Sequence, residues 1–319
     1  MWRYVTKRLM SLLIVLFCVA IIIFCILWFM PGDPAEVILG MNVPEADREA
    51  LRVKMGLNDP FLIQLGRFLR DIFLRLDFGE SYQFRVPVIE AFAERLPRTL
   101  KLGLISVLIQ TAIGIPLGVS AAIHRNSLMD QGLLVSAMVF ISVPQFWFAL
   151  MMVVLFSVQL EWLPPFGIGS IEYWIMPILA NSISGIAMNA RQTRSAVLET
   201  IRSDFVTTAR AKGLPEGKVI YKHMLPNALI PVINGIGMQL GMCVGGTVVI
   251  ESVFSFPGIG NYMLTGINGF DYPVVRGCVL ILAAVSAFMT LVVDLTYGFL
   301  DPRIKAQYVN YAAKKGGKH

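Results

Sequence analysis

The chain has 319 residues, of which 56% are hydrophobic and only 15% are charged, and its mean hydropathy is +0.67. A soluble domain of this size carries roughly 25% charged residues, so the composition excludes an ordinary soluble protein and indicates a membrane protein. The net charge of +6 is spread along the chain, which disfavours a nucleic-acid-binding surface. All four cysteines lie inside apolar runs, where we expect them to pack as small apolar residues without disulfides.

Six apolar stretches are long enough to cross a bilayer. A spanning helix needs about 20 mostly apolar residues, because lipid offers no hydrogen-bond partner to the backbone. The expected spans are residues 9–32, 102–123, 131–160, 173–190, 225–250 and 274–300. The first has a basic start, but its apolar run is longer than that of a signal peptide and no small-residue cleavage site follows. We therefore expect a retained helix.

Several local signals refine these spans. Residues 252–270 also lack charge, but their prolines and glycines oppose a regular helix in lipid, so we expect a loop or re-entrant cap packed on protein. Pro144 predicts a kink within the third span. The fourth span runs into the polar residues Arg191 and Arg194, so its helix should continue beyond the membrane. The glycines of the fifth span, from Gly235 to Gly246, permit close helix packing.

The loop charges predict the orientation. With six spans both termini lie on one side, and the segments of that side carry 16 Lys and Arg against five Asp and Glu. On the opposite side, residues 31–98 carry nine basic and eleven acidic residues, and the two shorter loops carry no Lys or Arg. The positive-inside rule therefore places both termini and the 191–226 loop in the cytoplasm.

The same reading divides the chain into four parts: an N-terminal transmembrane helix (1–32), an extracytoplasmic helical insert (33–98), a core with five spans (99–300) and a cytoplasmic tail (301–319). The insert has helical patterning at 45–55 and 62–76, and turn signals at Gly56 and Asp59-Pro60. Leu96-Pro97 is expected to open the second span.

A polar stretch, residues 204–226, separates two apolar runs and is called the coupling segment below. Ser203 and Asp204 can cap a helix over 205–212, and Gly213 suits the position after it. Pro215 suits the start of a second helix that ends near 224. The first helix is too short to be stable alone in water, so its apolar residues need a cover. Either a partner protein supplies that cover, or the chain's own helix ends or lipid head groups do.

The coupling segment resembles the cytoplasmic "EAA" signature of ABC importer permeases. Ala209, Gly213, Leu225 and Pro226 match that signature in type and spacing, whereas Thr207, Thr208 and His223 depart from its general form. The departures fit the peptide/nickel branch, whose form is similar to Asp204-Phe-Val-Thr-Thr-Ala-Arg-Ala-Lys-Gly213.

The resemblance covers nearly the whole chain and is closest to the first of the two permease subunits of dipeptide and oligopeptide importers. The further segments that carry it are Pro31-Gly-Asp-Pro-Ala35, Gly56-Leu57, Asp77-Phe-Gly-Glu-Ser81, Leu96-Pro-Arg-Thr-Leu100, Glu251-Ser-Val-Phe-Ser-Phe-Pro-Gly-Ile-Gly260, Asp271-Tyr-Pro273 and Asp301-Pro-Arg303.

What the resemblance implies is a type I ABC importer permease fold in the bacterial cytoplasmic (inner) membrane. The chain would be a non-catalytic translocation subunit without a metal or cofactor of its own. Its implied partners are a second homologous permease, two cytoplasmic ABC ATPases that bind ATP and Mg²⁺, and an extracytoplasmic substrate-binding protein. ATPase closure would move the permeases between inward- and outward-facing states. The residues expected to couple to the ATPase are Asp204, Phe205, Thr208, Ala209, Arg210, Ala211, Lys212, Gly213, Leu225 and Pro226.

Other readings stay open at this point. Gly213 to Val219 does not make a phosphate loop, because the glycine spacing is too short and no Ser or Thr follows Lys218. The cargo could be a peptide, a nickel ion or a metal chelate. A different class, an ion-coupled transporter, would use Asp294 as its coupling group. An intramembrane enzyme is disfavoured, because none of the three histidines lies at membrane depth.

Overall fold

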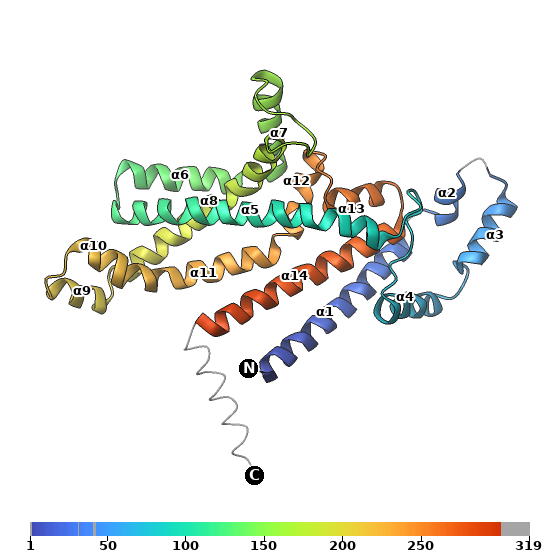
Figure 1. The fold of residues 1–319 in the computed structure, drawn as a ribbon, viewed down its shortest axis with the longest axis horizontal. Helices are drawn as coiled ribbons and strands as arrows, with labels where there is room; N and C mark the ends of the chain where they lie inside the picture. Colours follow the sequence, from blue (N-terminus) through green and yellow to red (C-terminus); the bar gives the residue numbers. More distant parts are fainter. Residues whose placement is uncertain (1, 31, 41–42, 301–319) are drawn as a thin grey trace, which may run out of the picture. The chain divides into compact units, whose positions relative to one another are not determined.

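The computed structural model describes residues 2–30, 32–40 and 43–300, and within these ranges it consists of helices and connecting turns without a β-strand. The expected all-α class is therefore confirmed for the described residues. The predictions that concern Pro31 and the tail 301–319 lie outside them. The helices group into two compact units, each built from separated stretches of the chain (Figure 1).

The first unit comprises residues Met1–Leu102, Glu161–Trp174 and Val244–Ser286. Its helices are α1 (Trp2–Phe29), α2 (Pro34–Leu39), α3 (Glu45–Met55), α4 (Phe61–Arg75), the 3-10 turn η3 (Gly245–Thr247), α12 (Val248–Val253), α13 (Ile259–Asn268) and the beginnings of α5 (Val88–Ile123) and α14 (Tyr272–Leu300). Its apolar core joins α1, α4 and α14 through Ala20, Ile23, Leu27, Phe68, Ile72, Val275 and Leu280.

Local sequence explains the limits of the insert helices. Asp33 caps α2, because its carboxylate accepts the Ala35 amide at 2.9 Å and Pro34 occupies the first turn. Gly56 ends α3 in the left-handed region, at φ +67°. The helices predicted at 45–55 and 62–76 are thus confirmed as α3 and α4.

Of the described residues, the second unit comprises Gly103–Leu160, Ile175–Cys243 and 287–300. Besides the remainders of α5 and α14, its helices are α6 (Leu128–Ser142), α7 (Gln145–Met152), the π-helix η1 (Val153–Gln159), α8 (Glu172–Thr200, which begins in the first unit), α9 (Asp204–Ala211), α10 (Glu216–Lys218), the π-helix η2 (Val219–Met224) and α11 (Leu225–Met242). The unbroken course of α8 to Thr200 confirms that this helix continues past Arg194.

Three of the described helices have the length and apolar character to cross a bilayer: Arg8–Phe29, Val88–Ile123 and Tyr272–Thr296. Two bent pairs raise the number to five if each counts as one span. The first pair breaks at Val143-Pro144 with a bend of 99°, so the predicted kink is a full break. The second pair bends by 70° near Gly245, where one helix over 225–250 was expected. The expected fourth span lies on α8, whose many polar residues keep it out of this set.

Two expected boundaries are wrong. Pro97 does not open the second span, because α5 begins at Val88 and buries Val88 and Phe92, whose packing outweighs the one amide lost at the proline. Residues 259–268, within the segment expected as a loop or re-entrant cap packed on protein, form the short helix α13 with Tyr262 buried, which confirms the packing on protein. The second helix of the coupling segment does not end near 224. It passes through η2 into α11, and the π-helical turn η2 lies just before Pro226, where the proline has no amide to donate to the preceding turn.

Candidate coupling surface

The helix α9 forms the first half of the coupling segment and has the expected ends. Ser203 has the extended backbone of an N-cap, although its side-chain oxygen accepts no amide of the helix and its hydroxyl donates to the Thr200 carbonyl (2.6 Å). The Thr208 hydroxyl donates to the Asp204 carbonyl at 2.8 Å. After Lys212, Gly213 adopts φ +72°, a region that other residues rarely enter. The predicted cap and turn are therefore confirmed in backbone geometry.

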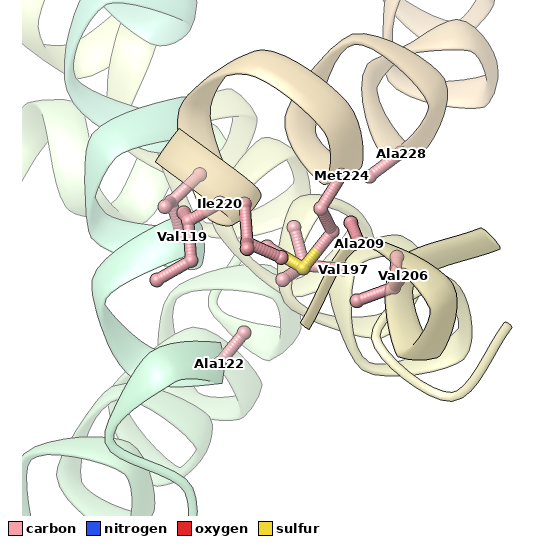
Figure 2. Close-up of a cluster of buried hydrophobic side chains, with 9 residues drawn as sticks. Val119, Ala122, Val197, Val206, Ala209, Ile220, Met224 and Ala228 are labelled. Carbon is pink, nitrogen blue, oxygen red and sulfur yellow. The ribbon is translucent and has the colours of Figure 1, made fainter. Parts of the chain in front are cut away.

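One face of α9 is buried within the second unit itself. Val206 is fully buried and Ala209 is 7% exposed, and both point into a cluster that gathers the ends of several helices (Figure 2). The other members are Val119 and Ala122 of α5, Val197 of α8, Val219, Ile220 and Met224 of η2, and Ala228 of α11. At about 25 cal/mol per Å² of apolar surface, such burial holds a helix too short to be stable alone.

This packing answers the question of what covers α9. The sequence left a partner or the chain's own helix ends as possible covers for its apolar residues. The chain's own helices cover Val206 and Ala209, so Ala209 supports the helix from beneath and is not accessible to a partner. Val206 and Ala209 are three residues apart in the sequence, and the next position is exposed. This spacing of small apolar residues indicates a helix with one buried face.

The rest of the surface of α9 is open, including positions that flank the buried face. Phe205 is 44% exposed, an unusual position for a large apolar side chain on a polar segment. The other expected coupling residues on this exposed surface are Asp204, Thr208, Ala211, Lys212 and Gly213. Tyr221, which sequence reasoning did not single out, is 67% exposed on the neighbouring η2. An exposed aromatic pair beside basic and polar groups is typical of a protein-docking surface.

The remaining coupling residues hold the segment together. Arg210 donates two hydrogen bonds to Glu216, at 2.6 and 3.2 Å, and thereby closes the turn through Gly213. The Glu216 carboxylate raises the pKa of Arg210, which stays charged. Leu225 is half-buried against the cluster of Figure 2, and Pro226 is exposed at the start of α11. Arg210 and Leu225 therefore position the surface, and Phe205 and Lys212 form it.

A buried ion pair lies in the same unit. Asp130 on α6 is 1% exposed, and both of its oxygens accept hydrogen bonds from the Arg194 guanidinium on α8, one of them at 2.8 Å. The Asn126 amide donates to the same carboxylate at 2.9 Å. A bidentate pair with a further donor satisfies a buried carboxylate well. Sequence reasoning counted both residues only as loop charges, because nothing in the sequence pairs positions 64 residues apart.

In the first unit, the segments that carry the family resemblance contact one another. The Glu251 carboxylate is fully buried and accepts hydrogen bonds from the Thr99 hydroxyl (2.7 Å) and the Gly260 amide (2.7 Å). It thereby closes the start of α13. A Cβ at Gly258 would come within 2.3 Å of this carboxylate, so only glycine fits there. Through these contacts, the segments that carry the resemblance hold the structure of the first unit together.

A second contact of this kind joins the Asp77–Ser81 and Asp271–Pro273 segments. The Ser81 hydroxyl donates to the Asp271 carboxylate at 2.5 Å, and the Gln83 amide donates to the same oxygen at 3.2 Å. The pairing fixes the turn before α5 against the start of α14. The charged residues weighed at the membrane lie apart from the coupling segment: Asp294 is partly buried on α14 and Lys101 is exposed on α5. Among the described residues, no group of three His, Cys, Asp or Glu side chains is arranged to hold a metal ion.

Apolar helices long enough to cross a bilayer, with a short helix seated on the ends of α5, α8 and α11, define a polytopic membrane protein. Residues 114–306 match the family described as binding-protein-dependent transport system inner membrane component, and residues 1–103 match the N-terminal region described for such membrane components. The chain therefore belongs to this family of transport permeases, as the sequence resemblance predicts.

Several named relatives align with almost the entire chain. The dipeptide transport system permease protein DppB of Alkalihalophilus pseudofirmus is 36% identical over 96% of this chain and 100% of its own length. A putative peptide transport system permease protein of Brucella abortus is 37% identical over 96% and 99%. The glutathione transport system permease protein GsiC of Salmonella paratyphi A is 37% identical over 96% and 99%. A chain from a crystal structure of an amino acid ABC transporter with histidines is 17% identical, with a TM-score of 0.49 over 67% of this chain and 94% of that one.

Proposed function

We propose that this chain is the transmembrane permease subunit of an ATP-driven, binding-protein-dependent importer for peptides or related small solutes. Family membership and the functions named for the relatives, which are dipeptide, peptide and glutathione transport, support the substrate class. The chain itself is non-catalytic in this proposal. ATP and Mg²⁺ belong to two cytoplasmic ATPase subunits, and a second permease and an extracytoplasmic binding protein complete the importer.

The single observation that carries the coupling mechanism is the two-sided construction of α9. Its buried face rests on the ends of α5, α8 and α11 through Val206 and Ala209, and its exposed face presents Phe205 and Lys212. A force applied to the exposed face passes directly into three long helices, because close-packed interiors transmit displacement with little compression. ATPase closure would thus shift the permease between two rigid arrangements.

The membrane topology belongs to the same proposal. Six spans with both termini in the cytoplasm place residues 33–98 outside, the core 99–300 in the membrane, and the 191–226 loop and the tail 301–319 inside the bacterial cytoplasmic membrane. The excess of Lys and Arg on the proposed inner side supports this orientation. Besides the three helices that qualify directly, six spans require that each of the two bent helix pairs crosses once and that α8 crosses despite its polar residues. Cysteine labelling from either side of sealed vesicles tests the topology at Thr207 and Val53.

The functional test reconstitutes the chain in liposomes, alone and with its co-purifying ATPase and permease partners. We expect uptake of a labelled dipeptide only with the partners, the binding protein and ATP. Uptake by the chain alone, driven by a pH gradient, would replace the proposal with an ion-coupled transporter that uses Asp294. Uptake of nickel and of a nickel chelate, measured beside the dipeptide, separates the possible cargoes.

The coupling test replaces Phe205 with Asp. The exposed position tolerates the change in folding, so we expect normal membrane levels but loss of ATPase co-purification and of transport. Leu74→Asp is the matched control, because Leu74 is a large apolar residue, 79% exposed, on α4 of the first unit. Undiminished ATPase co-purification with the Phe205 variant would contradict the docking role of this face.

A further inference from the structure

The first unit contains an open cavity of about 630 Å³ that the coupling mechanism does not use. Its walls come from α1, α3, α4, the segment between α4 and α5, and the first turns of α14. A neighbouring cavity of about 340 Å³ shares five of its lining residues, namely Phe24, Leu57, Gln64, Tyr82 and Arg276. The two cavities therefore adjoin along these residues, which include Arg276.

Arg276 is poorly satisfied by the protein around it. Its Nε is buried and has no hydrogen-bond partner among the described residues. The guanidinium lies over the Phe68 ring, 5.3 Å from the ring centre. The insert arginines Arg52 and Arg67, by contrast, each form an ion pair with a carboxylate. The carboxylates of Asp71, Asp77 and Asp271 attract Arg276 through space, but its Nε still has a donor to offer, so this position is suited to an anionic group brought by a ligand.

The rest of the wall restricts the kind of ligand. Asp71, Asp77 and Glu80 also line the larger cavity. Of these, Asp71 is paired with Arg70 and Asp77 accepts the Gly79 amide, and Glu80 is the most weakly engaged. Three arginines, Arg67, Arg85 and Arg276, also line it, so the cavity presents charges of both signs and matches a molecule with a negative and a positive end. An anionic lipid head group or a free phosphate would offer no positive group to the carboxylates of this wall.

The apolar part of the wall and the volume of the cavity also suit a small molecule. Phe24, Phe68 and Ile72 form an apolar side next to the charged groups. Cavities of about 300–1,000 Å³ that combine apolar walls with a few polar groups are typical of small-molecule sites. The larger cavity lies within this range and can hold a molecule of the size of a dipeptide or tripeptide.

We propose that this cavity binds a short zwitterionic peptide, with the peptide carboxylate on Arg276 and its ammonium group toward Asp77 and Glu80. The site would give the permease its own recognition of free peptide ends on the side of the insert. The inference rests on the proposed function, because it takes peptides as the cargo, and it adds a binding site within this chain.

The test measures equilibrium binding of labelled Ala-Phe and of Ala-Phe amide to the purified permease complex in nanodiscs, without the binding protein. We expect the free carboxylate to bind at least about tenfold more tightly, as for hydrogen bonds to charged groups. Arg276→Gln should abolish that preference, and Arg276→Lys should keep part of it. Arg75→Gln, an exposed arginine of α4 that does not line the cavity, should behave as the wild type.

A second variant addresses the other end of the peptide and covers the case that Arg276→Gln fails to assemble. Glu80→Gln should reduce the preference for Ala-Phe over N-acetyl-Ala-Phe and leave the carboxylate preference intact. Unchanged preferences in both variants would overturn the site. Loss of a co-purifying phosphatidylethanolamine from Arg276→Gln, seen by native mass spectrometry without an effect on peptide binding, would assign the cavity to lipid instead.

The same preparation separates this inference from the proposed function. ATP-driven uptake of Ala-Phe with the binding protein is measured in parallel. If the importer takes up Ala-Phe but direct binding shows no preference for the free carboxylate, only the proposed Arg276 site is wrong. Absence of peptide uptake by the complete wild-type importer would remove the proposed function itself.

Discussion

Two short helices, α3 in the insert and α9 in the coupling segment, are held in place by different forces. α3 has no buried residue and is tied by Arg48 and Arg52 to a set of carboxylates, Asp33, Glu36, Glu45 and Glu49. α9 has one ion pair, but its position depends on Val206 and Ala209 in an apolar cluster. Charge pairs near water are weak, adjustable and screened by salt, whereas apolar packing is rigid. A helix that transmits force needs the second kind of support.

The largest effect is expected from the turn that ends α9. Gly213→Pro cannot adopt the φ of +72° found there, because proline holds φ near −65°. The turn between α9 and α10 should then fail, at a cost of about 3 kcal/mol or more, and ATPase co-purification and transport should be lost. Hydrogen exchange of peptides covering 204–212 measures the local loss of protection.

Gly217→Ala is the matched control for that turn. Gly217 lies in α10 without positive φ, and an added Cβ meets nothing within 4 Å. Alanine there should be neutral or slightly stabilising, by about 0.5 kcal/mol. Retention of coupling by Gly213→Pro would show that the geometry of this turn does not matter for α9.

The next effect compares the two faces of α9 itself. Val206→Ala removes two buried methyl groups and should destabilise the seating of α9 by about 2 kcal/mol. Phe205→Ala, one residue away, should change protection of α9 by less than about 0.5 kcal/mol while reducing ATPase binding. Hydrogen exchange of α9 and co-purification of the ATPase are measured on both variants. The first reports the internal support of the helix and the second its contact with the ATPase. Equal loss of protection in both would mean that α9 has no distinct buried face.

The limits of prediction from sequence follow the same division of forces. Gly213, Gly56 and the helices at 45–55 and 62–76 could be predicted, because caps and periodicity are local properties of the chain. The cover of Val206 could not be predicted, since Val119, Val197 and Ala228 come from three distant helices. Asp130 with Arg194 and Ser81 with Asp271 were missed for the same reason. Proline was overrated at Pro97, where buried neighbours hold the helix, and underrated at Pro144, where the helix breaks.

A smaller effect is expected when the charge support of α3 is weakened. Arg52→Gln removes the hydrogen bonds to Asp33, at 2.5 and 2.9 Å, and those to Glu45 and Glu49. Exchange of the α3 amides should rise severalfold at low salt, and added salt should produce much of the same rise in the wild type. Lys54→Gln removes the same charge from an exposed position of α3 and is the control. The amides of α9 should not respond to salt, and a parallel response would remove the contrast between the two helices.

The smallest effect is a dependence on pH confined to α3. The hydrogen bond from Asn58, and then that from Arg52, lower the pKa of Glu49 below the ordinary carboxyl value of 4.5. A carboxyl with a lowered pKa stabilises the fold above that ordinary value, and the contribution disappears as the pH falls through the lowered pKa. Exchange of α3, corrected for the intrinsic rate, should therefore accelerate below pH 4.5. Asn58→Ala removes the largest cause and should move this transition to higher pH. The apolar contacts of Val206 and Ala209 have no titrating group, so the seating of α9 should persist over the same range of pH.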